Sequence, residues 1–261
     1  MKKLTLALAM AIMTTGSAFA SPFINGGFED GNTNGWATGA GYRGVTSNAN
    51  MAPGLFLPGG SLYNAANTNH SSIISAGTVD PLLGNLLGST VYNGNYSYRA
   101  EDTSSGGYAS VISQKVTNYT DANIFFAWKA VLENGGHSDD ESALMMIVLH
   151  DDTANTDVIR RVYNAGNGGG GVDGRFSTSG DFFYTSQWQL EQLTIDASLS
   201  GHDFTLSLLA ADCEPAAHTG YAYLDGFGSV LPPADVPEPM SLALLGAGLA
   251  GMGVVRRRKQ K

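Results

Sequence analysis

Nucleophilic catalysis and zinc binding both need histidine at particular spacings, and the histidines of this chain do not follow them. The sequence has no His-x-x-x-His pair, and no serine or cysteine lies in a nucleophile elbow. The single cysteine, Cys213, cannot form a disulfide within the chain, and we interpret it as a thiol without a chemical role. The five histidines are His70, His137, His150, His202 and His218. The sequence therefore predicts no catalytic constellation and no zinc site.

Acidic residues dominate the charged groups, with 23 Asp and Glu against 14 Lys and Arg. A pair of carboxylates can cleave a glycosidic bond, but almost any acidic composition would permit such a pair. Between residues 21 and 236, seven basic residues stand against 22 acidic ones, a net charge of −15. Such a surface repels phosphates and excludes nucleic acid as a partner. It favours cations that prefer hard oxygen ligands, calcium above all.

The elements that would position such residues are strands. Alternating or continuous apolar runs occur at 94–100, 109–116, 124–132, 143–150, 158–163, 188–195, 204–210 and 220–230, with shorter candidates at 55–57 and 72–74. The run Phe125-Phe126-Ala127-Trp128 is apolar on both faces, which predicts a central strand. Residues 151–157 have the composition of a hairpin loop. With 34 glycines and no long amphipathic helix pattern, the sequence predicts an all-β fold.

Both ends of the chain carry targeting segments. Lys2-Lys3, the apolar run 4–13 and Ala18-Phe19-Ala20 predict a signal peptide over residues 1–20. Residues 240–255 are uncharged and predict one short transmembrane helix, ~24 Å long at ~1.5 Å per residue. The basic residues after this helix stop the transfer of the chain across the membrane. Everything before Pro237 is therefore exported. The basic residues are Arg256, Arg257, Arg258 and Lys259. Residues 21–235 remain for one β-sandwich domain.

The C-terminal segment 236–261 resembles the PEP-CTERM sorting signal of bacteria that secrete exopolysaccharide. The resemblance rests on Pro237-Glu238-Pro239, the short apolar helix and the terminal basic run. It implies that a membrane enzyme, exosortase, recognises Pro237, Glu238 and Pro239 and removes the helix. The protein would then be anchored transiently in the inner membrane before it reaches the cell surface or the extracellular matrix. The alternative is an ordinary tail anchor with a chance Pro-Glu-Pro.

The two ends of the exported domain resemble jelly-roll carbohydrate-binding modules and galactose-binding-like domains. The first strand of these families reads Asn-Gly-x-Phe-Glu with Gly-Trp soon after, and the chain has Asn25, Gly26, Phe28, Glu29, Gly35 and Trp36. The closing strand matches at Tyr223-Leu224-Asp225, whereas Gly226 departs from the family pattern. The resemblance implies an antiparallel two-sheet jelly roll with a structural calcium ion held by Glu29 and Asp225. The alternative is that Glu29 caps a turn and Asp225 is solvated.

Two classes of function compete for this sequence. A non-catalytic glycan-binding or exopolysaccharide-matrix (biofilm) component is favoured, because the resemblance is to binding modules and no catalytic constellation is present. The alternatives are a hydrolase of the same polysaccharide and a structural surface protein without glycan binding. Exposed aromatic rings with polar neighbours would form a sugar site. The candidates are Tyr96, Tyr98, Arg99 and Tyr108, and the rival interpretation places two of the three tyrosines in the core.

Overall fold

The computed structural model of the protein describes residues 22–231. The signal peptide, the sorting motif at Pro237, Glu238 and Pro239, the transmembrane helix 240–255 and the basic tail from Arg256 to Lys259 all lie outside the described residues. Within residues 22–231, no helix has the length and apolar character needed to cross a membrane.

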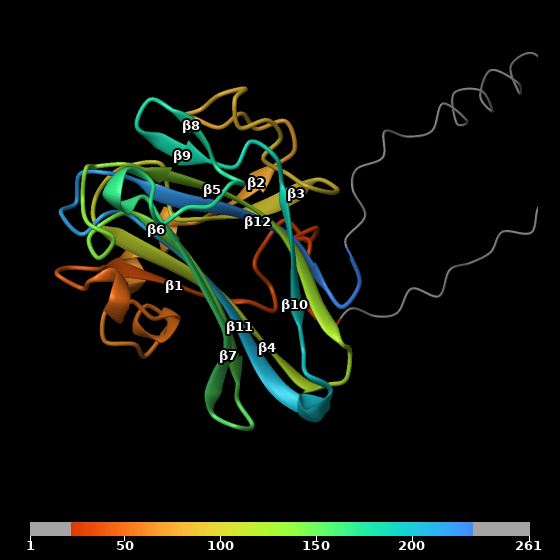
Figure 1. Ribbon diagram of the computed structural model, residues 1–261. Helices are drawn as coiled ribbons and strands as arrows, with labels where there is room; N and C mark the ends of the chain where they lie inside the picture. The colour runs from red at the N-terminus through yellow and green to blue at the C-terminus, as the bar shows by residue number, and fades with distance from the viewer. Residues whose placement is uncertain (1–21, 232–261) are drawn as a thin grey trace, which may run out of the picture.

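The described residues form strands joined by turns and short 3-10 helices (Figure 1). The strands are β1 (Ala37–Tyr42), β2 (Ser72–Ser75), β3 (Tyr96–Ala100), β4 (Tyr108–Tyr119), β5 (Asn123–Glu133), β6 (Leu144–Asp151), β7 (Thr156–Asn164), β8 (Ser177–Ser179), β9 (Phe182–Tyr184), β10 (Gln189–Thr194), β11 (His202–Ala211) and β12 (Gly220–Gly228). The 3-10 helices are η1 (Asn48–Asn50), η2 (Pro53–Leu55), η3 (Ala65–His70), η4 (Gly166–Gly168) and η5 (Ala197–Leu199).

These strands pair into two antiparallel sheets. The five-stranded sheet has the order β1-β4-β11-β6-β7. The seven-stranded sheet has the order β2-β3-β12-β5-β9-β8, and β10 also pairs with β5. The two sheets pack face to face (Figure 1). The predicted all-β, antiparallel two-sheet jelly-roll architecture is confirmed.

The core lies between the sheets, and β5 shows how the sequence builds it. Its inward side chains follow period two and are fully buried. They are Ile124, Phe126, Trp128, Ala130 and Leu132. The intervening Ala127 and Val131 are also buried, on the opposite face. The prediction of a central strand here is confirmed, because β5 has β12 on one side and β9 and β10 on the other.

Each sheet is also covered on its outer face by a long connection. Residues 45–64 place Met51 and Phe56 against the five-stranded sheet. Residues 76–91 place Leu83 and Leu87 against the seven-stranded sheet. The first cover approaches β1 so closely that a Cβ atom at Gly39 would overlap the carbonyl oxygen of Phe56. Both faces of the sheets are therefore largely apolar. This explains why apolar residues run continuously along several strands instead of alternating with polar ones.

Two local expectations are corrected by the structure. The Asn25-Gly26 opening is not a strand: Asn25 and Phe28 have left-handed φ angles of 49° and 57°, and turn hydrogen bonds close this segment. The first strand is β1, which its glycines hid from the pattern. Residues 55–57 do not form a strand either, because Pro53 begins η2 and Phe56 closes it.

Candidate functional site

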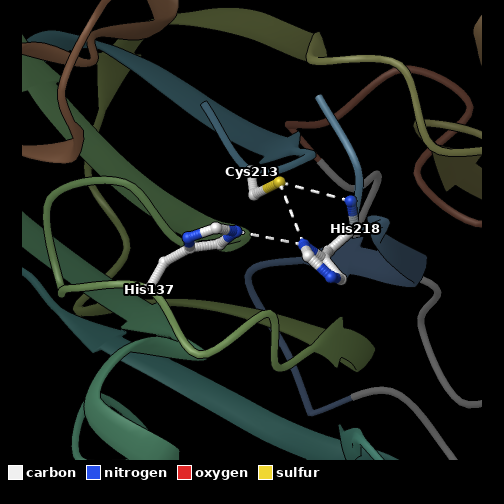
Figure 2. A group of neighbouring side chains, drawn as sticks. All are labelled: His137, Cys213 and His218. Atoms are coloured by element: carbon white, nitrogen blue, oxygen red, sulfur yellow. Dashed lines mark hydrogen bonds between the residues drawn. The ribbon is translucent and has the colours of Figure 1, made fainter. Parts of the chain in front are cut away.

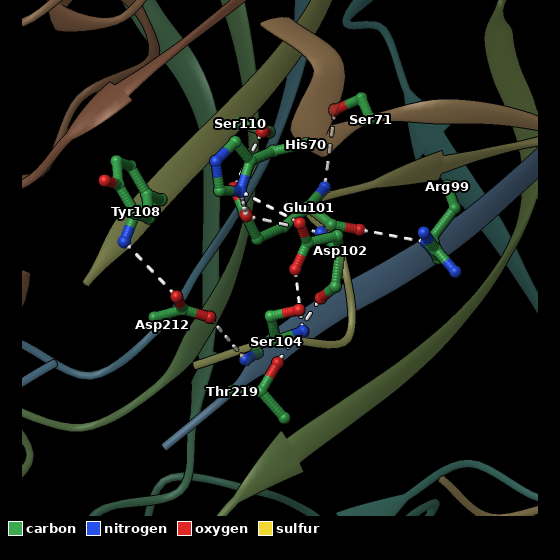
Figure 3. A network of polar contacts seen from close by, with 11 residues as sticks. His70, Ser71, Arg99, Glu101, Asp102, Ser104, Tyr108, Ser110, Asp212 and Thr219 are labelled. Carbon is green, nitrogen blue, oxygen red and sulfur yellow. Dashed lines mark hydrogen bonds and ion pairs between the residues drawn. The ribbon is translucent and has the colours of Figure 1, made fainter. Parts of the chain in front are cut away.

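Two groups of metal-ligating side chains come together in residues 22–231. One contains His137, Cys213 and His218 (Figure 2), and the other contains His70, Glu101 and Asp102 (Figure 3). The sequence showed neither group, because the members of each come from separate connections. The first group lies between the β5–β6 and β11–β12 loops. The second adjoins a polar pocket at the edge of the sandwich.

This pocket, which we call the hydroxyl cleft, has a volume of about 260 Å³. It lies beside the edge strands β1 and β2. All but one of its lining side chains end in a hydroxyl or an amide. The lining residues are Asn32, Thr33, Thr38, Thr68, Ser71, Ser72, Ile73 and Tyr98. Such a lining offers many hydrogen-bond donors and acceptors and no formal charge.

Tyr98 forms part of this lining and is the most deeply buried of its polar groups. Its ring stacks on Phe28 at a centroid distance of 5.5 Å, and only 2% of the residue is exposed. Among the described residues its hydroxyl makes no hydrogen bond of normal geometry, and Ser71 is the side chain that interacts with it. Burial raises the pKa of Tyr98, so the phenol stays protonated and can donate. A buried hydroxyl without a well-aligned partner costs free energy that a bound ligand could recover.

The second group adjoins the cleft through η3 and Ser71 (Figure 3). His70 Nδ1 lies 2.8 Å from Glu101 Oε1 and 3.1 Å from Asp102 Oδ2. The Ser110 hydroxyl donates to Glu101 Oε2 at 2.7 Å, and Glu101 is fully buried. The bond to Glu101 is the main reason that the pKa of His70 is raised. This arrangement favours an imidazolium balanced by two carboxylates.

An aromatic pair borders the same network. Tyr42 and Tyr108 are register partners at the end of β1 and β4, and their rings meet at 5.7 Å in a T-shaped contact. The Tyr108 ring also lies 4.3 Å from the His70 ring. Tyr42 is 51% exposed, so this pair presents a ring to solvent, and Asp102, which pairs with His70, is partly exposed.

A third carboxylate of the network, Asp212, is fully buried and accepts from the backbone N–H groups of Tyr108 and Gly220 at 3.3 and 3.2 Å. Burial, and then the charge of Glu101, raise the pKa of Asp212 to about 8. Neither Asp212 nor Glu101 presents an oxygen to solvent. Both act inside the protein, where they hold the β3–β4 connection and the strand ends in place.

The four sugar-contacting residues expected from the sequence do not form one site in the structure. Tyr98 lines the cleft, Arg99 donates from Nε to the Glu101 carbonyl at 3.1 Å, and Tyr108 borders the network. Tyr96 lies apart, half-buried beside Gly31. The ring of Tyr98 belongs to the core, and its hydroxyl is buried beneath the cleft. The sequence missed His70, Glu101 and Tyr42, because no local pattern links η3, β3 and β1.

The predicted calcium ligands Glu29 and Asp225 also lie close together. A Cβ atom at Gly27 would lie 3.7 Å from both Asp225 Oδ1 and Glu29 Cγ. Glu29 accepts from the backbone N–H groups of Asn95 and Tyr96 at 3.0 and 3.1 Å. It therefore joins the turn-rich opening to the start of β3.

Asp225 is fully buried, and its two oxygens have different surroundings. Oδ2 accepts from the backbone N–H groups of Tyr92 and Asn93 at 2.9 and 3.1 Å, whereas Oδ1 makes no hydrogen bond of normal geometry among the described residues, and the Gly226 N–H is a further backbone donor to the carboxylate. Burial is the main cause that raises the pKa of Asp225 to about 7, and the charge of Glu29 adds to it. The alternative of a solvated Asp225 is thus wrong. Two neighbouring carboxylates with a free buried oxygen are suited to a hard cation.

A second pocket, of about 280 Å³, lies on the outer face of the five-stranded sheet. Ionisable side chains line it, and none of its lining residues is Phe, Tyr or Trp. The ionisable ones are His150, Asp152, Asp157 and Arg160. Because uncharged hydroxyl and amide groups match the hydrogen-bonding groups of a sugar, we consider the hydroxyl cleft the better candidate.

Solved structures similar to this chain include TmCBM61 in complex with β-1,4-galactotriose, at 10% identity and TM-score 0.44, covering 80% of this chain and 96% of that one. A carbohydrate-binding module specific for non-crystalline cellulose, CBM28, has 12% identity and TM-score 0.38, covering 82% and 95%. The enzymatically active domain of tailspike protein 4 from bacteriophage CBA120 has 10% identity and TM-score 0.36, covering 81% of this chain and 21% of that one.

No curated protein matches the chain. Its C-terminal segment does match a family, the PEP-CTERM protein-sorting motif, over residues 235–259. The match includes Pro237, Glu238 and Pro239 and extends through the basic residues to Lys259. The chain therefore carries a PEP-CTERM sorting motif, which marks it as an exported protein directed to the cell surface.

Proposed function

We propose that the protein is a non-catalytic glycan-binding component of the cell surface or exopolysaccharide matrix, released from the inner membrane by exosortase. The sorting motif supports the proposed export to the cell surface. The hydroxyl cleft supports the proposed glycan binding, and the aromatic pair Tyr42 and Tyr108 offers a further contact for a sugar ring.

The observation that carries this proposal is the Tyr98 hydroxyl, which is buried without a hydrogen bond of normal geometry beneath a cleft of hydroxyl and amide groups. Sugar hydroxyls both donate and accept hydrogen bonds, as do the Thr and Ser side chains that line the cleft. If the side chains over Tyr98 move on binding, a glycan hydroxyl would give the phenol a better-aligned partner than Ser71. Binding there would therefore recover the cost of an unsatisfied buried group.

The aromatic pair and the charge of the domain extend this argument. An exposed ring at Tyr42, supported by Tyr108, can stack on the apolar face of a pyranose, and Asp102 can accept from its hydroxyls. The net charge of −15 over residues 21–236 repels polyanions. A neutral polysaccharide is therefore the ligand class that fits best.

The hydrolase alternative requires two carboxylates that reach the scissile bond. Glu101 and Asp212 are fully buried and accept internal hydrogen bonds, which favours a structural role for both. Asp102 alone is partly exposed in this network. These observations support binding over cleavage, and the experiment below separates the two.

We further propose that a structural calcium ion binds between Glu29 and Asp225. Support comes from Oδ1 of Asp225, which makes no hydrogen bond of normal geometry within residues 22–231, and from the proximity of the two carboxylates. An ion there would tie the opening turns to β12 and would offset the cost of burying charge.

Affinity electrophoresis of the secreted protein against the producer's own exopolysaccharide tests the activity. We expect retardation of the native protein and ~3- to 10-fold weaker binding by Tyr98→Phe, which loses one hydrogen bond. Tyr98→Phe should keep nearly the same melting temperature, because the hydroxyl makes no hydrogen bond of normal geometry within residues 22–231. The matched control is Tyr119→Phe, which changes an equally buried tyrosine at the end of β4, outside the lining of the cleft, and should bind normally.

Other outcomes would contradict the proposal. New reducing ends in the polysaccharide would identify a hydrolase. No retardation of the native protein would leave the structural surface protein as the better description. Equal binding by Tyr98→Phe and the native protein would move the site away from the hydroxyl cleft.

A further inference from the structure

Three ligand atoms of the kind that bind transition metals converge at one end of the sandwich (Figure 2). His137 Nε2 lies 3.1 Å from His218 Nδ1, and Cys213 Sγ lies 3.4 Å from the same nitrogen. All three atoms lie within 4.8 Å of one another. Zinc at ~2.3 Å from sulfur and ~2.0–2.1 Å from nitrogen places its ligand atoms ~3.3–3.6 Å apart. The observed spacing therefore needs only small side-chain movements to hold an ion.

The surroundings of the sulfur suit a thiolate ligand. Cys213 is fully buried, and its Sγ accepts from the backbone N–H groups of Ala217 and His218 at 3.3 and 3.2 Å. Two N–H donors pointing at one sulfur stabilise negative charge on it. The Cys213 N–H also donates to the His218 carbonyl at 3.0 Å, which closes the loop. Cys213 and His218 are thus held in place by their own backbone.

The third group is positioned by a different connection. The carbonyl of His137 accepts from the Asn167 N–H at 2.9 Å, which fixes this part of the β5–β6 loop. A Cβ atom at Gly135 would overlap the rings of both His218 and His137, so glycine is needed for the two loops to meet. Both histidines remain partly exposed, which leaves an approach from solvent.

We propose that Cys213 Sγ, His218 Nδ1 and His137 Nε2 bind one divalent transition metal ion, with zinc as the representative. A thiolate with two imidazoles is a donor set for zinc or copper and not for calcium. Three protein ligands leave the fourth position for water or for a donor atom of a bound molecule. This site is separate from the hydroxyl cleft and from Glu29 and Asp225.

The location explains what such an ion would do. The β5–β6 loop and the β11–β12 loop each cross from one sheet to the other. An ion shared by both loops joins the two crossings at the same end of the sandwich. Because the single cysteine cannot form an internal disulfide, a metal link is a cross-link that this exported chain can make.

Zn²⁺ titration of the chelator-treated full chain tests the proposal, with bound metal and melting temperature as readouts. We expect one ion per chain and a raised melting temperature, and about tenfold or more weaker binding in Cys213→Ser, His218→Gln and His137→Gln. The matched control is His150→Gln, because His150 pairs with Asp157 away from the site and its loss should leave zinc binding unchanged. Co²⁺ should give a thiolate charge-transfer absorption band that is absent from Cys213→Ser.

His137→Gln guards against variants that do not fold, because His137 is partly exposed on a loop and its metal-free melting temperature should match that of the native protein. No zinc binding by the native chain would overturn the proposal and leave a histidine–histidine hydrogen bond beside a buried thiol. So would binding that His137→Gln and Cys213→Ser leave undiminished, or a Co²⁺ complex without the thiolate band.

Discussion

At the residue scale, Asp225 has a buried carboxylate that makes only half of its contacts within the protein. Oδ2 has two backbone donors, and Oδ1 makes no hydrogen bond of normal geometry among the described residues. Charging such a group costs free energy unless a cation or a proton accompanies it. This is why the pKa of Asp225 rises to about 7.

Calcium removal should therefore lower the melting temperature of the native protein. An ion that binds only the folded state stabilises it by RT ln(1 + [L]/Kd), or ~2.7 kcal/mol at a hundredfold excess over Kd. A thermal melt with calcium and with a calcium-selective chelator measures this difference. Asp225→Asn should melt at the same temperature in both conditions. If the native protein showed no difference either, no calcium would bind between Glu29 and Asp225.

Lys129 is the other buried charge with a marked effect, on the outer face of the seven-stranded sheet. Its Nζ donates to the Leu87 carbonyl and, at 3.1 Å, to the Ser186 carbonyl. Burial lowers the pKa of Lys129 from 10.5 to about 8, although Asp80 opposes the shift. Between these pH values the folded protein holds fewer protons than the unfolded chain, so raising the pH favours folding through this group.

We expect the native protein to gain stability relative to Lys129→Met as the pH rises from 8 toward 10.5. The gain is on the order of 1–3 kcal/mol, at ~1.4 kcal/mol per pKa unit. Urea unfolding of both proteins at pH 7.5 and pH 10 measures it. The comparison removes the effect of tyrosine ionisation, which both proteins share. If the free energies of unfolding of the two proteins changed with pH in the same way, burial would not lower the pKa of Lys129.

At the scale of elements, the two covering connections do more than fill the outer faces. Residues 76–91 are tied to β12 by Asp80, which is 2% exposed. The hydroxyls of Tyr221 and Tyr223 both donate to Oδ2 of Asp80 at 2.9 Å, and the Leu83 N–H donates to its Oδ1 at 2.7 Å. One carboxylate thus joins this cover to the closing strand.

Asp80→Ala should lower the free energy of unfolding by ~3 kcal/mol or more, because it leaves buried donors without an acceptor. Urea unfolding measures the loss. The control is Asp157→Ala, which removes an exposed carboxylate paired with His150 and should change stability by no more than ~0.5 kcal/mol. Similar values for the two variants would mean that the Asp80 hydrogen bonds do not hold the cover.

The other cover depends on close backbone approach at Gly39. Gly39→Ala should destabilise the protein by ~1–3 kcal/mol, because its Cβ would overlap the Phe56 carbonyl and displace residues 45–64. Limited proteolysis should then cut within residues 45–64 faster than in the native protein. Gly54→Ala, which meets open space, is the control. Equal cleavage rates in Gly39→Ala and Gly54→Ala would argue against this packing.

At the scale of the whole molecule, the sorting motif decides where the domain acts. We expect the secreted protein to end beside Pro237, Glu238 and Pro239, because exosortase would remove the helix that follows. Intact mass measurement of the secreted form tests this. Replacing Pro237 and Pro239 by alanine should retain the protein in the membrane, whereas Gln260→Ala should be released normally. A secreted product that still carries residues 240–261 would rule out the processing.

Much of the fold could be predicted because strands have a local signature. Residues 124–132 and 204–210 lie within β5 and β11, and residues 152–155 connect β6 to β7 as the predicted hairpin. The pattern failed at β1, where glycines replace apolar side chains to admit residues 45–64. At residues 25–31 the glycine-rich pattern indicates turns, and left-handed turns that pack against Phe227 stand where the family resemblance implied a first strand.

By itself the sequence determined the export route and the fold class, since a sorting motif and strand periodicity are written in contiguous residues. Only the tertiary structure decided the sites. Antiparallel pairing brings His137 to Cys213 and His218, which follow it by more than 70 residues, and brings Tyr42 beside Tyr108. It also buries the Tyr98 hydroxyl and Asp225 Oδ1 without a hydrogen bond of normal geometry inside residues 22–231. Such features depend on which loops come into contact when the two sheets pack. A local sequence pattern does not predict contacts between loops that are far apart in the chain.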